Sequence, residues 1–509
     1  MNPTTEAYIE AAIRRLDEAL NRANFRTVQC GDSPDAWEWT GTVGNRDREP
    51  AIISLGPNFP FEAPRVVLPQ RANQIDWHQM PNGVLCLWNS HSLGGQPWLD
   101  GDRLVARIEE WISHAEDGWV DDMPQLDLEA YNNLWIELRD ERLFAPVLVI
   151  DKWEEIEGGW FRATPPDENG LLTVVKAHLP APAIPAPIRS KKKKGARAIG
   201  QHRLNKYVNA IAIDLGRITR PFIFTERLAE EAGANGPLIA GLLEAGRPVL
   251  FVARYTRDES AGFIGFWLEF GKESGILRRC FPVAERRNAQ QRRAGWHAAA
   301  LTDRKVSVIG AGSIGSYLAD LLHRSGLKEL TVHDDDTLLP GNLTRHAASP
   351  AFIGSFKTSA VRETANQRTP EYPIKTSSSV QGLSEAVELL RDQDLVVDCT
   401  GDRLTWQLLL AAAEVTGRSF LHVAVVGHGQ AGRVDICPPM DDADPIPESI
   451  VQPFAATEWE AGCGDPVSPT PPTAVIETAA MGARFAIRML AGEAVPPAGE
   501  SRELFPVSP

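Results

Sequence analysis

Cysteine is scarce in this sequence and is never paired. The 509 residues contain six cysteines, and none belongs to a Cys-x-x-Cys motif. The scattered, unpaired cysteines argue against a disulfide framework and against a cysteine-rich zinc site. Any cysteine that takes part in chemistry is therefore expected to be a single thiol nucleophile.

Positive charge and long apolar runs are also in short supply. Lysine and arginine total 52 against 67 aspartates and glutamates, so the formal net charge is −15, which argues against a general nucleic-acid binder. No apolar run approaches the roughly 18–20 residues of a membrane span. The first ten residues, MNPTTEAYIE, lack the basic and apolar regions of a secretory signal. We expect a cytoplasmic protein with neither nucleic-acid nor membrane partners.

The length allows about three domains of ~150 residues each. Apolar residues at helical spacing predict one helix over 4–21, capped by Thr4 or Thr5, and another over 102–114. Short β-rich stretches between turn residues predict an antiparallel meander between these helices: 37–43, 51–55 and 65–68. We therefore expect a first α+β domain over 1–145.

The region 146–284 has a less regular pattern and predicts a small mixed linker domain. Strands are predicted at 207–215 and 248–255. A proline-rich stretch, 179–188, is followed by four lysines at 191–194, which is typical of an exposed loop. We assign no function to these lysines, because a short basic run is more often a solvated loop.

A strand, a glycine turn and a helix open the third region, 285–509. The β-branched strand 305–309 runs into three glycines with the GxGxxG spacing, namely Gly310, Gly312 and Gly315. Such a turn lets the backbone approach a phosphate, which the amides of the following helix also attract. The helix should end at Gly326, before a second strand at 329–333, and this order predicts a parallel α/β sheet.

Charged residues after the second strand indicate which nucleotide is bound. Asp334, at the strand end, can accept hydrogen bonds from ribose hydroxyls. By itself this pattern fits a dinucleotide dehydrogenase, or a glycine turn without a ligand. A mixture of acidic and basic side chains follows instead: Asp336, Asn342, Arg345 and Lys357. Cations suit the β and γ phosphates and a carboxylate suits Mg²⁺, so the mixture favours a triphosphate with its metal.

The stretches VIGAGSIGS, LTVHDDD, NLTRH and GSFK, in this order, resemble the ThiF/MoeB superfamily, which includes the ubiquitin-activating enzymes. The resemblance covers about 285–509 and implies a Rossmann-like adenylation domain that uses ATP and Mg²⁺. It also implies that Asp334 binds the ribose, and that Asn342, Arg345 and Lys357 contact the phosphates.

Two further family features have no unique match here. The family's Mg²⁺ aspartate lies in a CTDN-like stretch, whereas this chain has DCTGDR. Asp402, one position later, is our choice, and Asp398 is the alternative. In the family an arginine ahead of the glycine turn often enters the partner subunit's ATP site, which implies a homodimer. Four arginines occupy that neighbourhood: Arg286, Arg287, Arg292 and Arg293.

Adenylation gives a mixed anhydride that a thiolate can convert into a thioester. Cys463 lies between glycines in EAGCGDPVSP, where a loop can carry it to the nucleotide, and is our candidate nucleophile. Cys399 and Cys437 follow apolar strands and are expected to be core residues. The lack of a Cys-x-x-Cys zinc site favours the protein-conjugation branch over the sulfur-carrier activators.

The first domain carries a second resemblance. FPFEAPRVVL, PNGVLCLW and QPWLDGDRL, in this order over about 1–140, resemble ubiquitin-conjugating enzymes and imply that Cys86 accepts the activated protein. A half-buried strand cysteine is the alternative reading. The family's asparagine eight residues before the cysteine is His78 here, which would stabilise the oxyanion or orient the amine. Asn82 and His91 are alternative donors.

Together these features predict a multidomain α/β fusion protein resembling the bacterial ubiquitin-conjugating and ubiquitin-activating fusions of antiphage systems such as CBASS. We expect it to adenylate the C-terminal glycine of a CD-NTase or ubiquitin-like partner. Cys463 would capture the acyl group, Cys86 would receive it, and a lysine or other amine would take it. The alternatives are a ThiF/MoeB-type activator of a sulfur carrier, a nicotinamide oxidoreductase, and an interaction protein with degenerate sites, suggested by Gly401 and His78.

Overall fold

The computed structural model describes most of the chain, in two compact units, Met1–Ala289 and Gln290–Pro509. The described residues are 3–31, 33–44, 48–72, 74, 76–80, 83–88, 96–120, 128, 131–132, 147–167, 171–183, 207–222, 233–258, 260–271, 275–285, 290, 293–368, 372–449, 451, 459–460, 465–466 and 468–505. Within these ranges no helix combines the length and the hydrophobicity that a membrane crossing needs. The division of the chain at 145 and 284 stays a prediction.

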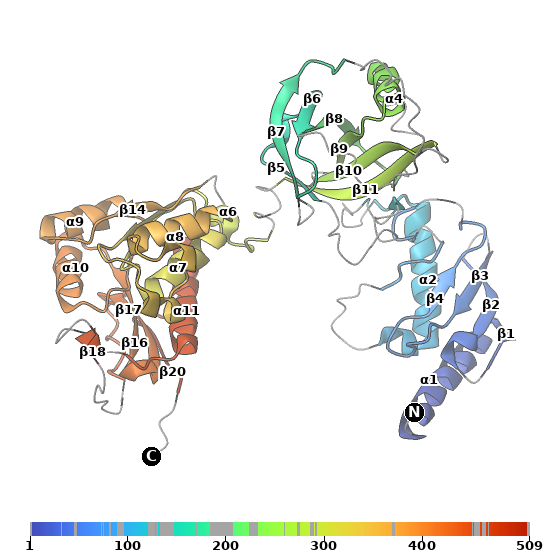
Figure 1. Ribbon diagram of the computed structural model, residues 1–509. Coiled ribbons are helices and arrows are strands. Elements are labelled where there is room, and N and C mark those ends of the chain that lie inside the picture. Colours follow the sequence, from blue (N-terminus) through green and yellow to red (C-terminus); the bar gives the residue numbers. More distant parts are fainter. Residues whose placement is uncertain are drawn as a thin grey trace. The chain divides into compact units, whose positions relative to one another are not determined.

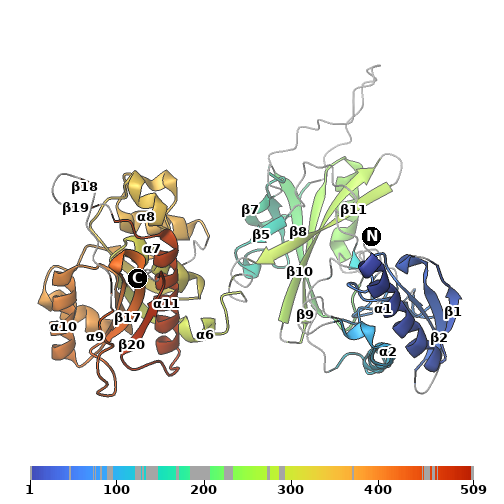
Figure 2. The ribbon, with the colours of Figure 1, turned by 90° about the horizontal axis from the view of Figure 1, so that it is seen from below.

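The first part of unit 1 is a sheet with two helices. Its elements are α1 (Pro3–Arg22), β1 (Arg26–Gln29), β2 (Glu38–Val43), β3 (Glu49–Ser54), β4 (Arg65–Val67) and α2 (Gly101–Glu116). The strands pair antiparallel in the order β1-β2-β3-β4, and α1 runs alongside this sheet (Figures 1 and 2). Both predicted helices and the meander are confirmed, and β1 is an additional strand. Thr4 and Thr5 do not cap α1, because the helix already begins at Pro3.

Residues 147–285 contain a closed seven-stranded barrel. Its elements are β5 (Val147–Ile150), β6 (Trp160–Ala163), β7 (Leu171–Leu179), β8 (Val208–Arg217), β9 (Val249–Arg257), β10 (Ser260–Gly271) and β11 (Gly275–Glu285), with the helix α4 (Gly236–Glu244). The strand order is β10-β11-β5-β7-β6-β8-β9. The sequence predicted a small mixed domain here with the strands β8 and β9, and it missed the other five strands of the barrel. The lysines at 191–194 lie outside the described residues.

The two faces of the barrel strand β9 enter two different cores. Leu250 and Val252 on β9 pack with Trp153 and other residues of one core. The intervening Phe251 belongs to the other core, which is continuous with that of the first part of unit 1. A strand buried on both faces reads as a continuous apolar run without the alternation of a half-buried strand.

Unit 2 is built on a seven-stranded sheet. Its strands are β12 (Lys305–Ile309), β13 (Glu329–His333), β14 (Lys375–Ser377), β15 (Leu395–Asp398), β16 (Phe420–Val426), β17 (Ala431–Cys437) and β20 (Gly499–Glu503), in the order β14-β13-β12-β15-β16-β17-β20. The first five are parallel, and β17 and β20 are antiparallel. The predicted parallel α/β sheet is therefore confirmed, with an antiparallel edge. A separate pair of two-residue strands, β18 (Trp459–Glu460) and β19 (Asp465–Pro466), completes the unit.

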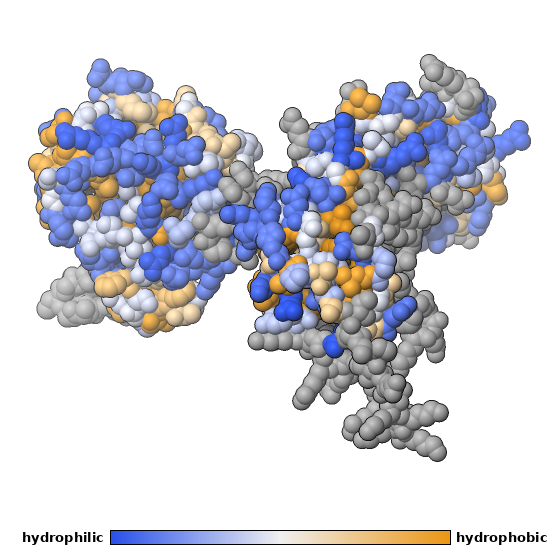
Figure 3. All heavy atoms as spheres, turned by 90° about the horizontal axis from the view of Figure 1, so that it is seen from above, coloured by the Kyte–Doolittle hydropathy of each residue, from blue (hydrophilic) through white to orange (hydrophobic). Residues whose placement is uncertain are grey.

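Helices cover both faces of the unit 2 sheet (Figure 1). They are α6 (Ala298–Leu301), α7 (Ser313–Arg324), α8 (Lys357–Asn366), α9 (Leu383–Asp392), α10 (Arg403–Thr416) and α11 (Pro472–Leu490). Val306 and Val308 of β12 pack in a core with α7, α8 and α11. Ile309 packs instead in the core of α9 and α10. In Figure 3 hydrophilic side chains cover most of the coloured surface, with hydrophobic ones in separate groups.

Candidate functional site

The glycine turn after β12 needs glycine at two positions for different reasons. Gly310 has a φ of +89°, and a Cβ there would also meet the backbone of Thr400 at 3.0 Å. A Cβ on Gly315 would lie 1.8 Å from the Gly310 carbonyl oxygen, so only glycine lets α7 start this close to the strand. By contrast, a Cβ on Gly312 would meet nothing within 4 Å. Gly312 therefore faces open space, where a phosphate has room.

Asp334 is hydrogen-bonded to this turn. Its Oδ2 accepts the backbone N–H of Ala311 at 2.7 Å, and its Oδ1 accepts the N–H of Asp336 at 2.7 Å. Asp334, which is predicted to bind the ribose and follows β13, thus lies beside the glycine turn that follows β12. Parallel neighbouring strands account for this, since their carboxyl ends meet at one edge of the sheet.

Asp336 and Lys357 form an ion pair at the start of α8. The Lys357 Nζ lies 2.7 Å from the Asp336 Oδ2, and the Lys357 N–H donates to the Asp336 carbonyl at 2.8 Å. Only 14% of the Lys357 side chain is exposed, against 72% for Asp336. Asn342 lies in the 3₁₀ helix Pro340–Arg345 and accepts the Leu339 N–H at 2.9 Å.

Arg345 is tied to the segment that precedes α11. Its Nη1 donates to the carbonyls of Ser468 at 3.1 Å and Thr470 at 3.4 Å. Ser468 is five residues beyond Cys463, which itself lies outside the described residues. The cation predicted to contact phosphate thus also holds the chain that follows the predicted nucleophile.

His346 is a site residue to which the sequence analysis gave no role, although it belongs to the NLTRH stretch. It is buried, and its Nε2 lies 2.7 Å from the carbonyl oxygen of Ala311 in the glycine turn. A carbonyl only accepts, so Nε2 carries the proton, while Nδ1 accepts the Ala348 N–H at 3.1 Å. Burial lowers the pKa of His346, which fits this neutral form.

The two candidate metal aspartates differ in exposure. Asp398 is fully buried: one oxygen accepts the Thr400 hydroxyl at 2.7 Å, and the other lies 2.8 Å from the Nδ1 of His422. Asp402 is exposed and caps α10, and the backbone N–H and then the hydroxyl of Thr405 lower its pKa. An exposed, ionised carboxylate is the better Mg²⁺ ligand, so Asp402 is favoured.

Protein groups alone do not complete a metal site in the described part of the chain. It holds no group of three or more histidine, cysteine, aspartate or glutamate side chains that would bind a metal ion. Mg²⁺ commonly takes only one or two carboxylates and completes its shell with substrate phosphates and water. Asp402 fits that pattern and does not fit a dedicated metal cage.

Cys86 lies in the segment between β4 and α2 of unit 1. It is exposed and belongs to no strand, so the alternative reading as a half-buried strand residue is wrong. Its backbone N–H donates to the carbonyl of His78 at 2.7 Å, and the same carbonyl accepts the Trp111 indole N–H at 3.0 Å. His78 has a φ of +54° and its ring stands 4.7 Å from that of Trp119. Asn82 and His91 lie outside the described residues.

Two opposing influences act on the Cys86 thiol. Protein atoms around it exclude part of its water and raise its pKa, and the positive charge of Arg107 partly counters this rise. Arg107 lies on α2 and is fixed by its Nε, which donates to the Leu87 carbonyl at 2.8 Å. The resting thiol is thus mostly protonated at neutral pH, despite its exposure.

Cys399, directly after β15, is a core residue as predicted, and Cys437, at the end of β17, is partly buried against a core. Cys399 is buried, and burial, followed by the charge of Asp398, raises its pKa well above the ordinary value. Cys437 packs against the core of α9 and α10, and burial raises its pKa to about 12. Buried thiols whose pKa is raised this far are poor nucleophiles, unlike an exposed thiol.

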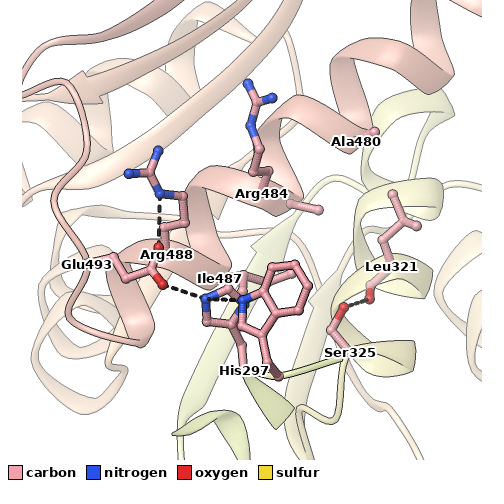
Figure 4. Close-up of a pocket in the computed structure, with 10 residues that line it drawn as sticks. His297, Leu321, Ser325, Ala480, Arg484, Ile487, Arg488 and Glu493 are labelled. Atoms are coloured by element: carbon pink, nitrogen blue, oxygen red, sulfur yellow. Dashed lines mark hydrogen bonds and ion pairs between the residues drawn. The ribbon is translucent and has the colours of Figure 1, made fainter. Parts of the chain in front are cut away.

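A pocket of about 460 Å³ lies elsewhere in unit 2 (Figure 4). It is lined by residues of α7, α11 and the segment before α6, including Trp296, whose exposed fraction is 91%. His297 and Glu493 pair across it at 2.7 Å. Leu321 and Ser325 place the pocket at the C-terminal end of α7, whereas the glycine turn lies at its N-terminal end. This pocket is therefore separate from the candidate nucleotide site.

Comparisons with known proteins found a family model and relatives that each match part of the chain. Residues 287–480 match the model of the ThiF family. The ATP-dependent ubiquitin transferase-like protein Cap2 of Enterobacter hormaechei is 30% identical over 211 residues, which cover 40% of this chain and 35% of that protein. The molybdopterin-synthase adenylyltransferase of Escherichia coli is 31% identical over 102 residues, which cover 20% of this chain and 41% of that protein. The chain thus spans less than half the length of either relative.

Among solved structures, E. coli MccB with ATP is similar to part of the chain. It is 15% identical, with a TM-score of 0.31, and the match covers 43% of this chain and 71% of that one.

Proposed function

We propose that this chain, whose residues 287–480 match the ThiF family model, uses ATP to activate the C-terminal carboxylate of a partner protein and passes the acyl group to an amine through thioesters. The observation that carries the proposal is the hydrogen bond that joins Asp334 to Ala311 in the glycine turn, beside the open space at Gly312. The exposed thiol of Cys86 in unit 1 supports the transfer half.

The residues around the glycine turn suit ATP. The open space at Gly312 admits a phosphate, and Asp334 lies where ribose hydroxyls would bind. Arg345 and Lys357 would neutralise the β and γ phosphates, with Asn342 beside them. Both cations are now bound to protein groups, so ATP would exchange these contacts for phosphate oxygens. Asp402 would hold Mg²⁺, which when bound offsets charge on the phosphates and on departing pyrophosphate.

Activation follows from this arrangement. A carboxylate oxygen of the partner's C-terminal glycine attacks the α-phosphorus, the bond to the bridging oxygen breaks, and pyrophosphate leaves. The electron pair of that bond goes to pyrophosphate, whose developing charge Arg345 and Lys357 stabilise. A cysteine thiolate then attacks the acyl carbon and AMP leaves, which gives a thioester. We assign this capture to Cys463.

Cys86 is the proposed acceptor of the acyl group. Its thiolate attacks the Cys463 thioester, the Cys463 thiolate leaves, and an amine such as a lysine of the target finally displaces Cys86. The backbone bond from the Cys86 N–H to the His78 carbonyl supports a role for His78 in this last step. We propose that its imidazole donates to the oxyanion or orients the amine.

The partners are proposed from the resemblances. The name of the Cap2 relative and the antiphage fusions that the sequence resembles favour a CD-NTase or a ubiquitin-like protein as the activated partner. We also propose a cytoplasmic homodimer in which an arginine reaches the partner subunit's nucleotide. Of the four candidates only Arg293 lies within the described residues.

A second function is activation of a sulfur carrier, which the similarity to the molybdopterin-synthase adenylyltransferase favours. Both functions predict adenylation, but only conjugation predicts a requirement for Cys86. Adenylation of the partner without any acyl transfer to an amine, in wild type and in Cys86→Ala alike, would support the sulfur-carrier function.

Exchange of radiolabelled pyrophosphate into ATP tests the activation step. The full chain is mixed with candidate partner proteins from neighbouring genes, each intact or without its C-terminal glycine. We expect exchange only with an intact partner, and loss of exchange in Lys357→Ala. Lys375→Ala is the matched control, because Lys375 pairs with Glu329 on the surface of the same unit. The proposal would be contradicted if pyrophosphate exchange also occurs with a partner that lacks its C-terminal glycine, or if it persists in Lys357→Ala.

A further inference from the structure

Trp77, next to the proposed catalytic His78, is held by the barrel. It is fully buried, and its indole Nε1 donates to the carbonyl of Thr219 at 2.9 Å. Thr219 lies just beyond the end of β8. The Nδ2 of Asn132 similarly donates to the carbonyl of Phe222 at 2.9 Å, so a second side chain of the first part reaches the same barrel segment.

Arg257 is the second barrel contact of Trp77. It ends β9, only 6% of it is exposed, and its guanidinium carbon stands 4.5 Å from the centroid of the Trp77 ring. A guanidinium is costly to bury unless partners compensate for its lost water, and an aromatic face is one such partner. The buried charge therefore fixes the ring and the strand end against each other.

The backbone around Trp77 leads directly to Cys86. Asp76 accepts the backbone N–H of Trp77 at 2.8 Å and the indole N–H of Trp119 at 3.1 Å. His78 follows with a left-handed φ of +54°, an uncommon conformation for a residue other than glycine. The His78 carbonyl then accepts the Cys86 N–H at 2.7 Å. A chain of contacts thus runs from β9 through Trp77 and His78 to the thiol residue.

We propose that the barrel is a positioning element for the Cys86 site, in which Arg257 and the Thr219 carbonyl hold Trp77 and thereby the His78–Cys86 backbone contact. Arg257 and Trp77 are positioning residues. The meaning of this arrangement for acyl transfer rests on the proposed function, whereas the arrangement itself does not depend on any activity. It gives the region 147–285 a role that its sequence pattern did not indicate.

Amide hydrogen exchange of the full chain tests the proposal without a partner protein. The reporter is the peptide that contains Cys86, compared between wild type, Arg257→Leu, Arg257→Lys and Trp77→Phe. Arg254→Leu is the matched control, because Arg254 lies on the same strand and pairs with Asp214 at 2.6 Å. We expect exchange at Cys86 to be about tenfold faster in Arg257→Leu, as for loss of a desolvated cation–π contact. The exchange rate at Cys86 in Arg257→Lys should lie between those of wild type and Arg257→Leu, and the rate in Arg254→Leu should equal that of wild type.

The alkylation rate of Cys86 against pH gives a second readout, in a background with Cys30 and Cys463 changed to serine. We expect the profile to move to lower pH in Arg257→Leu, since a looser site hydrates the thiol. If Arg257→Leu does not fold, Trp77→Phe provides the test, because it keeps an aromatic ring but loses the hydrogen bond to Thr219. Folded variants with wild-type exchange and alkylation at Cys86 would overturn the proposal. If amide exchange at Cys86 changes in the variants but the wild-type protein transfers no acyl group, the positioning role is supported and the proposed function is contradicted.

Discussion

The backbone N–H of Cys86 donates to the carbonyl of His78 at 2.7 Å, although eight residues separate them. The bond joins the backbone of Cys86 to the backbone of the position that resembles the conjugating enzymes' asparagine. His78 also has a left-handed backbone at a φ of +54°, which asparagine adopts more readily than most residues. The site can therefore be altered at His78 without forcing a new backbone.

Substitution of His78 should separate its side chain from its backbone. We expect His78→Ala to slow discharge of acylated Cys86 to lysine by about 10²-fold, the usual effect of losing an oxyanion donor. His78→Asn should retain most of the rate, because it supplies an amide donor and tolerates the same backbone conformation. Single-turnover discharge measures this step apart from activation. Equal rates in all three proteins would assign His78 a structural role.

The pKa of the Cys86 thiol should respond to Arg107. Because the thiol's raised pKa is partly offset by the Arg107 charge, Arg107→Gln should raise it further and move the alkylation profile to higher pH. Below the pKa the rate should rise about tenfold per pH unit, since only the thiolate reacts. The rate of reaction with iodoacetamide measures the shift. Arg103→Gln is the control on the same helix, where Arg103 stands over Trp88, and an equal shift there would contradict the assignment.

Two glycines of one turn should respond differently to alanine. In Gly315→Ala the new methyl group would overlap the Gly310 carbonyl, so we expect unit 2 to lose ~1–3 kcal/mol of unfolding free energy or more. Gly312→Ala meets open space and should fold normally, but its methyl group would occupy the room left for a phosphate and weaken ATP binding. Urea denaturation and calorimetric titration with ATP measure the two effects. Normal ATP affinity in Gly312→Ala would place the nucleotide elsewhere.

The two aspartates after β15 offer a matched test of the metal ligand. Asp402→Asn still caps α10, because asparagine is an equally good cap, but it should raise the Mg²⁺ concentration needed for pyrophosphate exchange. Asp398→Asn removes the charge beside His422 and should instead lower stability. Mg²⁺ titrations of exchange, with thermal denaturation, distinguish the two. A Mg²⁺ effect confined to Asp398→Asn would reverse the assignment.

Sequence reasoning succeeded where the pattern is local. The unit of β12, glycine turn, α7 and β13 was predicted because strand, turn and helix signals follow each other within about thirty residues. Only β8 and β9 of the barrel were predicted, and the closed barrel was missed because pairs such as β5 with β11 join strands far apart in the sequence. The bonds from Arg345 to Ser468 and from Trp77 to Thr219 join residues 123 and 142 positions apart, and no local signal announces them.

The central claim is an acyl relay from Cys463 to Cys86, and trapping of partner adducts tests it most directly. The full chain, ATP, Mg²⁺ and an exchange-competent partner are mixed without reductant in wild type, Cys86→Ala and Cys463→Ala, and the modified cysteine is located by mass spectrometry. We predict a reducible adduct on Cys86 in wild type, an adduct on Cys463 in Cys86→Ala, and none on Cys86 in Cys463→Ala. Undiminished loading of Cys86 in Cys463→Ala would contradict the relay.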